Sequence, residues 1–224
     1  MDNELQKSFP TRELQDFVSP KALENIKNLS QIMMMYNCAI REVRTKFEVL
    51  NDELSTTTNR NPIEMIKSRV KKPESILNKL IRRGYELNVD SIMNKIYDVA
   101  GVRVVCSFID DIYKVADMFS AQDDVTVIEI KDYIKNPKDN GYRSYHMIVE
   151  IPVFFSNKKQ NIKVEVQLRT IAMDFWASLE HSMKYKKDVR NADEISKELK
   201  SCADLISEAD LRMQDINNKI NRNS

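Results

Sequence analysis

The strongest concentration of charge in the sequence is residues 67–84, KSRVKKPESILNKLIRRG, with seven basic side chains and one acidic one. Pro73 predicts the first turn of a helix, and Gly84 predicts its end. One face of this helix would carry a hydroxyl and two cations, Ser75, Lys79 and Arg82, and the other face Ile76, Leu77, Leu80 and Ile81. Arg69 and Lys71 precede the helix, where free backbone N–H groups also favour phosphate. The pattern therefore indicates a phosphate-binding surface, although a solvated basic face explains this segment equally well.

Two carboxylates lie close to the ends of predicted strands. Asp98 precedes a β-branched run at residues 102–106, and Glu165 lies in IKVEVQLR on the side opposite to the apolar residues. Arg103 inside the first strand would be costly as an unpaired ion, so an ion pair with Asp98 is one explanation of both residues. Together with the cationic helix, the two carboxylates predict a site for Mg²⁺ and polyphosphate, because water and phosphate oxygens complete the Mg²⁺ octahedron.

Residues 131–144, KDYIKNPKDNGYRS, form a predicted loop that combines four basic side chains with two tyrosines. Its Asn, Pro and Gly residues are typical of a long connection. An aromatic ring among cations suits a nucleotide whose base stacks on the ring, although turns often carry Tyr and Lys. His146 follows at the start of the next strand, where a histidine is more often structural than catalytic.

The composition of the 224-residue chain excludes several classes of protein. Three glycines are too few for the phosphate-binding loops GxxxxGK[ST] and GxGxxG, so side chains would have to hold any phosphate. A net charge of +1 argues against binding long nucleic acid through overall charge. Three widely spaced cysteines argue against a disulfide framework or a zinc site. No apolar stretch approaches the roughly 20 residues of a membrane span, so we expect a cytoplasmic protein.

Long helices are predicted at both ends of the chain. Ser19 and Pro20 start the first, which has apolar residues at alternating steps of four and three: Leu29, Met33, Tyr36, Ile40, Val43, Phe47, Leu50 and Leu54. The C-terminal segment repeats the pattern with Ile195, Leu199, Cys202, Ile206, Ala209, Met213, Ile216 and Ile220. Such seams pack within the fold or join subunits, and we favour packing within the fold.

The segment between these helices predicts an α+β fold. Short strands at 102–106 and 125–130 are joined by a helix that starts near Asp110, and longer strands at 145–153 and 162–169 form a hairpin. Thr170 caps a further helix. We predict a mixed β-sheet flanked by helices, with an N-terminal helical extension at 1–59, one domain at 60–187 and a C-terminal helix at 188–224.

The segments RVKKPESI, DVAGVRVVC, KDYIKNPKDNGYRSYH, VEVQLRTIAMDFWASLEH and KYK, in this order, resemble the small alarmone synthetases of the RelA/SpoT superfamily. The resemblance covers about residues 60–187 and is closer to the RelP-type branch than to the RelQ-type branch. It implies a nucleotidyltransferase-like domain that transfers the β,γ-pyrophosphate of ATP to the 3′-hydroxyl of GTP or GDP, with Mg²⁺, to make the (p)ppGpp of the stringent response. It also implies a homotetramer. The only histidines are His146 and His181, with no HD pair, so we expect no hydrolase activity.

The resemblance further implies roles for individual residues. Arg69 and Arg103 would flank the adenine, and the ATP phosphates would be held by Lys71, Ser75, Lys79 and Arg82. Asp98 would bind Mg²⁺, and Glu165 would bind it too or accept the ribose proton. Tyr142 would stack on guanine, with Lys138 and His146 near the phosphates and ribose of the acceptor. The remaining candidates are Gln167 and Glu180 as supports, and Asp174, where some relatives carry an Asn expected to contact guanine.

Two other functions fit parts of the pattern. A non-catalytic nucleotide- or RNA-binding module would use the basic helix and Tyr142. It gives Asp98 and Glu165 no task, because carboxylates repel a polyanion unless a metal ion intervenes. A helical interaction protein would use the two apolar seams to bind a partner.

Overall fold

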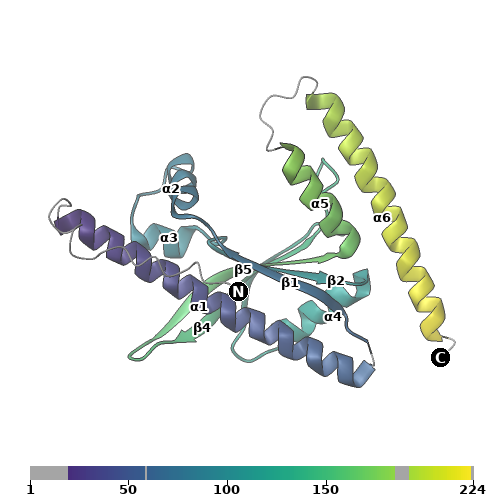
Figure 1. The fold of residues 1–224 in the computed structure, drawn as a ribbon, viewed down its shortest axis with the longest axis horizontal. Coiled ribbons are helices and arrows are strands. Elements are labelled where there is room, and N and C mark those ends of the chain that lie inside the picture. The colour runs from purple at the N-terminus through teal and green to yellow at the C-terminus, as the bar shows by residue number, and fades with distance from the viewer. Residues whose placement is uncertain (1–19, 59, 185–191, 223–224) are drawn as a thin grey trace, which may run out of the picture.

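The computed structural model describes residues 20–58, 60–184 and 192–222. Its helices surround one five-stranded sheet (Figure 1). The strands have the order β1-β2-β5-β4-β3, with β2 and β5 parallel and the other neighbours antiparallel. The elements are α1 (Pro20–Thr58), β1 (Ile63–Val70), α2 (Pro73–Arg82), α3 (Val89–Lys95), β2 (Ala100–Cys106), α4 (Ile109–Ser120), β3 (Thr126–Asp132), β4 (Tyr145–Phe154), β5 (Lys159–Thr170), α5 (Ile171–Lys184) and α6 (Ala192–Arg222). The mixed sheet, the flanking helices and the β4–β5 hairpin are confirmed.

Helix α1 lies across the sheet and supplies part of the core (Figure 1). Its seam residues Tyr36, Val43 and Phe47 are buried, and Phe47 stacks on Phe119 of α4 with ring centroids 4.3 Å apart. An apolar stripe at helical spacing needs a cover, and here the sheet and α4 provide it. The prediction that the N-terminal seam packs within the fold is therefore confirmed.

The basic segment 67–84 begins inside strand β1, which the sequence analysis did not predict. This strand lies at the edge of the sheet, and Ile63 is its only buried residue. A strand with so few buried positions has little alternation of apolar and polar residues, and this alternation is the pattern from which a strand is predicted. Helix α3 was also missed because it has only seven residues; Asn88 caps it by accepting a hydrogen bond from the backbone N of Ser91 at 2.8 Å.

Helix α2 begins at Pro73 and is followed by Gly84, whose φ of +67° suits glycine, as predicted. Its inner face is narrower than predicted. Ile76 and Leu80 are fully buried, whereas Leu77 and Ile81 are exposed. The remaining surface of the helix is free for polar side chains, including those that turn toward the sheet.

Helices α5 and α6 lie side by side at one end of the sheet (Figure 1). The hydroxyl of Thr170 accepts a hydrogen bond from the backbone N of Met173 at 3.1 Å, so the predicted cap of α5 is confirmed. The prediction that the C-terminal seam packs within the fold is wrong along much of its length. The seam residues Cys202, Ala209, Met213, Ile216 and Ile220 are exposed, and the inner face consists of Leu199, Ala203, Ile206, Asp210 and Gln214.

The inner face of α6 escaped prediction because two of its members are polar. Asp210 accepts a hydrogen bond from the Thr170 hydroxyl at 2.6 Å, and the side-chain oxygen of Gln214 accepts one from the backbone N of Asp110 at 3.0 Å. Buried polar groups need such partners, and apolar periodicity cannot reveal them.

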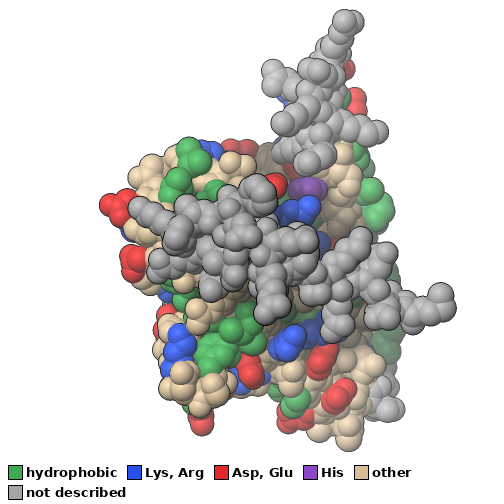
Figure 2. Space-filling view, turned by 60° about the vertical axis from the view of Figure 1, so that its left-hand side comes forward, with side chains coloured by type: hydrophobic (Ala, Val, Ile, Leu, Met, Phe, Trp, Pro, Cys, Tyr) green, Lys and Arg blue, Asp and Glu red, His purple; other side chains and the backbone are tan. Residues whose placement is uncertain are grey.

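On the face shown in Figure 2, Lys and Arg side chains lie among Asp and Glu side chains, and the visible part forms no continuous basic surface. Within the described ranges, no helix has the length and apolar character that crossing a membrane requires.

Candidate active site

The central strands bring the predicted site residues onto one face of the sheet. Gly101 on β2 is aligned with Glu165 on β5. Two residues further along, Arg103 on β2 is aligned with Gln167 on β5, and Gln167 with His146 on β4. Along β5 these polar residues alternate with fully buried apolar ones, so they share the opposite face of the sheet. Residues far apart in the sequence thus meet at the middle of the sheet.

A pocket of about 230 Å³ opens on this face, and we call it the carboxylate pocket. Both predicted catalytic acids, Asp98 and Glu165, line it, together with Arg69 and Arg103. The remaining lining residues are Lys67, Ser68, Gly101, Val102 and Gln167. The pocket therefore combines acidic groups with cationic walls.

Asp98 is held by two of the predicted phosphate-binding lysines. Its Oδ2 accepts from Lys71 Nζ at 2.6 Å and pairs with Lys79 Nζ at 2.7 Å. Burial by itself raises the pKa of Asp98, but the two ammonium groups outweigh it, and the pKa is lowered below its ordinary value. Asp98 is therefore ionised at neutral pH. The alternative ion pair between Asp98 and Arg103 is wrong.

Glu165 is held by two other predicted site residues. Gln167 Nε2 donates to Glu165 Oε2 at 2.9 Å, and His146 Nδ1 lies 3.5 Å from Oε1. Burial raises the pKa of Glu165, and the charge of Asp98 also raises it, but the interactions with His146 and Gln167 outweigh both and lower the pKa. Two ionised carboxylates therefore face the same pocket.

A second pocket, of about 340 Å³, adjoins the first, and we call it the aromatic pocket. It shares Arg69, Arg103 and Gln167 with the carboxylate pocket. Its other lining residues are Tyr142, Arg169, Ala177, Ser178, Glu180 and His181. The shared side chains allow two ligands to lie close together, one in each pocket.

The cations around Tyr142 fit the predicted binding of a base and phosphates. Lys138 Nζ lies 4.8 Å from the centre of the Tyr142 ring and 4.6 Å from that of Tyr133. The Tyr142 hydroxyl lies 2.7 Å from His146 Nε2, so His146 connects Tyr142 to Glu165. This contact gives His146 a place within the site.

Arg169 is a site residue that the sequence analysis did not select. Its guanidinium donates to the Tyr142 hydroxyl at 2.7 Å, to Gln167 Oε1 at 3.1 Å and to Asp174 Oδ1 at 3.0 Å. It is buried, and it fixes one group at the aromatic pocket and one at the carboxylate pocket. The only signal in the sequence was its position on the same side of β5 as Glu165 and Gln167.

Asp174 lies behind the aromatic pocket and does not line it. It is buried and accepts hydrogen bonds from both Arg103, at 3.1 Å, and Arg169, at 3.0 Å. These two bonds orient the guanidinium groups at the junction of the pockets. The structure thus places Asp174 as a support for the arginines.

Three other candidates lie further from the pockets or act as supports. Glu180 lines the aromatic pocket and accepts a hydrogen bond from Asn140, next to Gly141, at 3.0 Å. Ser75 and Arg82 lie on α2 outside the lining of both pockets. Four other predicted residues also lie outside the lining but contact Asp98, Glu165 or Tyr142, which do line the pockets: Lys71, Lys79, Lys138 and His146. The geometry therefore brings most of the predicted residues together but not Ser75 and Arg82.

Asp98 and Glu165 fit a magnesium ion better than a transition metal. In the part of the chain that the structure describes, no three His, Cys, Asp or Glu side chains are grouped as metal ligands. Asp98 Oδ1 is buried there without a hydrogen-bond partner among the described residues. Hard carboxylate oxygens suit Mg²⁺, which retains water and phosphate ligands and needs few from the protein.

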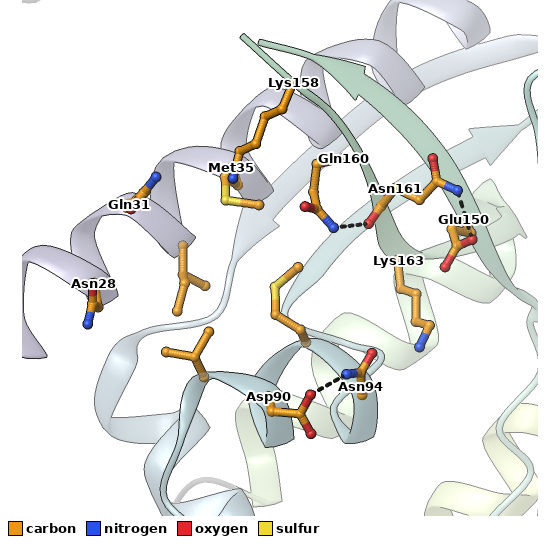
Figure 3. A pocket seen from close by; sticks show the side chains of 13 residues that line it. Asn28, Gln31, Met35, Asp90, Asn94, Glu150, Lys158, Gln160, Asn161 and Lys163 are labelled. Atoms are coloured by element: carbon orange, nitrogen blue, oxygen red, sulfur yellow. Dashed lines mark hydrogen bonds between the residues drawn. The ribbon is translucent and has the colours of Figure 1, made fainter.

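A larger pocket, of about 540 Å³, lies between α1, α3 and the end of the β4–β5 hairpin (Figure 3). None of the predicted site residues lines it. Its two acids already accept hydrogen bonds, Asp90 from Asn94 at 2.8 Å and Glu150 from Asn161 at 3.3 Å. The candidate active site is therefore the pair of smaller pockets.

Two ionised carboxylates thus line a cationic pocket, and this pocket shares Arg69, Arg103 and Gln167 with an aromatic pocket, an arrangement that suits an enzyme with two nucleotide substrates. The sequence profile described as the region found in RelA / SpoT proteins matches residues 68–190, and the chain belongs to this family. The GTP pyrophosphokinase YwaC of Bacillus subtilis is 43% identical over 84% of this chain and 90% of its own length.

Solved structures of small alarmone synthetases are also similar to this chain. The small alarmone synthetase 2 of Bacillus subtilis aligns with a TM-score of 0.77 and 42% identity, covering 86% of this chain and 99% of that chain. The small alarmone synthetase 1 of Bacillus subtilis, bound to its product pppGpp, aligns with a TM-score of 0.78 and 33% identity, covering 87% of this chain and 99% of that chain. The predicted family, fold class and enzyme class are confirmed.

Proposed function

We propose that this chain is a GTP pyrophosphokinase that transfers the β,γ-pyrophosphate of ATP to the 3′-hydroxyl of GTP or GDP. One observation carries the proposal: two ionised carboxylates line a cationic pocket that shares three side chains with an aromatic pocket. The relatives named above are GTP pyrophosphokinases and small alarmone synthetases, and one is bound to pppGpp.

ATP would occupy the carboxylate pocket. Arg69 and Arg103 would stack on the adenine, because guanidinium planes stack on aromatic rings. The phosphates would lie toward α2, where the cations and hydroxyl of the predicted set are Lys71, Ser75, Lys79 and Arg82. Lys71 and Lys79 already neutralise Asp98, so an incoming triphosphate would compete for the same ammonium groups.

The acceptor nucleotide would occupy the aromatic pocket. Its guanine would stack on Tyr142, and its phosphates would lie near Lys138, whose ammonium group is already above the ring. Gln167 lies in both pockets and donates to Glu165, so the ribose of the acceptor would be close to that carboxylate.

Glu165 is ionised, and it would bind the metal ion or accept the proton of the ribose hydroxyl. A hydroxyl is a poor nucleophile until a base removes its proton. His146 and Gln167 hold the carboxylate in place before substrates arrive. Catalysis would then consist mainly of positioning and charge neutralisation.

Asp98 and Glu165 would hold Mg²⁺. When bound, this ion would neutralise phosphate charge and polarise the transferred group. Both carboxylates are ionised at neutral pH, and Asp98 Oδ1, unlike the Oδ2 paired with the lysines, has no hydrogen-bond partner among the described residues.

The proposal extends to the setting of the enzyme. The domain at 60–187 would carry the chemistry, with the flanking helices as supports, in a cytoplasmic homotetramer of the RelP-type branch. The exposed apolar residues of α6 offer a surface for contact between subunits.

A single experiment tests the function. Purified protein is incubated with labelled ATP, unlabelled GTP and Mg²⁺, and the nucleotides are separated by anion-exchange chromatography. We expect labelled pppGpp and AMP in equal amounts. A protein that binds both nucleotides but forms neither product would instead be the non-catalytic module.

A further inference from the structure

The C-terminal helix α6 packs very closely against the loop that carries Tyr142, with Gly141 of the loop next to Ala203 of the helix. Gly141 is buried and has a φ of +85°, which suits glycine. A Cβ atom added to Gly141 would lie 2.5 Å from the Cβ of Ala203 and 3.6 Å from the backbone of Lys200. The loop and the helix can approach this closely only because both residues are small.

Polar contacts hold the loop to the helix at the same place. Arg143 follows Tyr142 and pairs with Asp204 at 3.3 Å, and it also donates to the carbonyl oxygens of Gly141 at 3.0 Å and Ala203 at 3.4 Å. The residues on both sides of Tyr142 are thus attached to one turn of α6.

The position of α6 is set by contacts with the rest of the domain. The indole N–H of Trp176 donates to the carbonyl of Leu199 at 2.9 Å, and Asp210 is bonded to Thr170. Tyr142 packs against the small cluster of Trp176, Ala177 and Ala203. A change in the position of α6 would therefore reach Tyr142 through packing as well as through the loop.

We propose that Ala203 and Asp204 are positioning residues for the acceptor nucleotide. Through Gly141 and Arg143 they hold Tyr142 in the orientation needed to stack on a guanine base, without touching the nucleotide. This inference rests on the proposed function, in which Tyr142 binds the acceptor. The groups assigned to ATP lie on or next to β1, β2 and α2, and of these Arg103 is also held by Asp174 of α5, so we expect the main effect on the acceptor.

The test is a comparison of kinetic constants. Ala203→Leu should push the loop away and raise the KM for GTP by about tenfold or more, while the KM for ATP and kcat at saturating GTP stay within about twofold. Asp204→Asn keeps the size of the side chain and weakens its pair with Arg143, together with its pair with Lys200 inside α6 at 2.9 Å, so its KM for GTP should rise by about threefold. Ser201→Leu introduces the same side chain on an exposed side of α6 and should match the wild type.

Binding without turnover gives an independent readout. Trp176 is the only tryptophan of the chain, and its fluorescence can follow titration with GTP alone. We expect weaker GTP binding by Ala203→Leu and wild-type binding of a nonhydrolysable ATP analogue. Wild-type GTP affinity in a folded Ala203→Leu variant, or equal loss of both nucleotides, would overturn the inference. If that variant does not fold, an unchanged KM for GTP in Asp204→Asn overturns it. A wild-type protein that binds no GTP would instead refute the proposed function.

Discussion

Replacing Asp98 by asparagine removes one of the two carboxylates from the carboxylate pocket without changing the shape of the side chain. We expect turnover by Asp98→Asn to fall by at least about 100-fold. The reason is that the proposed Mg²⁺ would stabilise the charge of the transition state by several kcal/mol. The variant should also need more Mg²⁺ for its residual activity, since one ligand of the ion is weakened.

The stability of Asp98→Asn follows from its contacts. Asp98 accepts from Lys71 at 2.6 Å and Lys79 at 2.7 Å, and its side chain is only 26% exposed. Each hydrogen bond to a charged group contributes about 1.5–3 kcal/mol. The amide oxygen can still accept from one lysine, so we expect a loss of about 2 kcal/mol, or about 4–8 °C in Tm for a chain of this length.

The assay measures pppGpp by chromatography across a Mg²⁺ series and Tm by thermal unfolding. Asp90→Asn is the matched control, because Asp90 is exposed, bonded to Asn94 and outside both smaller pockets. It should keep wild-type turnover and a Tm within about 1 °C. Wild-type turnover in Asp98→Asn would refute the metal assignment, and an unchanged Tm would refute the role of Asp98 as the partner of the two lysines.

Other predictions concern neighbouring parts of the site. Glu165→Gln should fold with a Tm near that of the wild type but make no detectable pppGpp; activity above about one tenth of wild type would contradict its role. Tyr142→Ala should weaken acceptor binding by about 1–3 kcal/mol, seen as a higher KM for GTP at unchanged KM for ATP. In Arg169→Lys, the lysine cannot make the three hydrogen bonds of the Arg169 guanidinium at the same time. We expect its free energy of unfolding in urea to be lower by about 1–3 kcal/mol and its KM for GTP to be higher. Wild-type values of both would show that these hydrogen bonds are dispensable. The pKa values of Asp98 and Glu165 are lowered from 3.8 and 4.5, so both groups stabilise the fold above these values, and that contribution is lost as the pH falls through their folded-state pKa values. The free energy of unfolding should therefore fall below about pH 4, and less steeply in Asp98→Asn.

Regular patterns in the sequence predicted the central elements of the fold. The seam of α1 and the hairpin strands β4 and β5 bury apolar side chains at constant spacing, and such spacing is visible in one dimension. Edge strand β1 and short helix α3 bury few side chains, so their sequences carry little periodicity. The inner face of α6 depends on hydrogen bonds made by Asp210 and Gln214, and their partners are known only after folding.

The sequence by itself determined the chemistry that the protein carries: cationic, acidic and aromatic side chains, a chain too poor in glycine for a phosphate-binding loop, and ordered motifs that resemble one family. Only the tertiary structure decided how these side chains pair. Asp98 meets Lys71 and Lys79 instead of Arg103, and Arg169 joins Tyr142, Gln167 and Asp174. The reason is physical, since strand register and helix packing set distances between residues that the order of the chain leaves free.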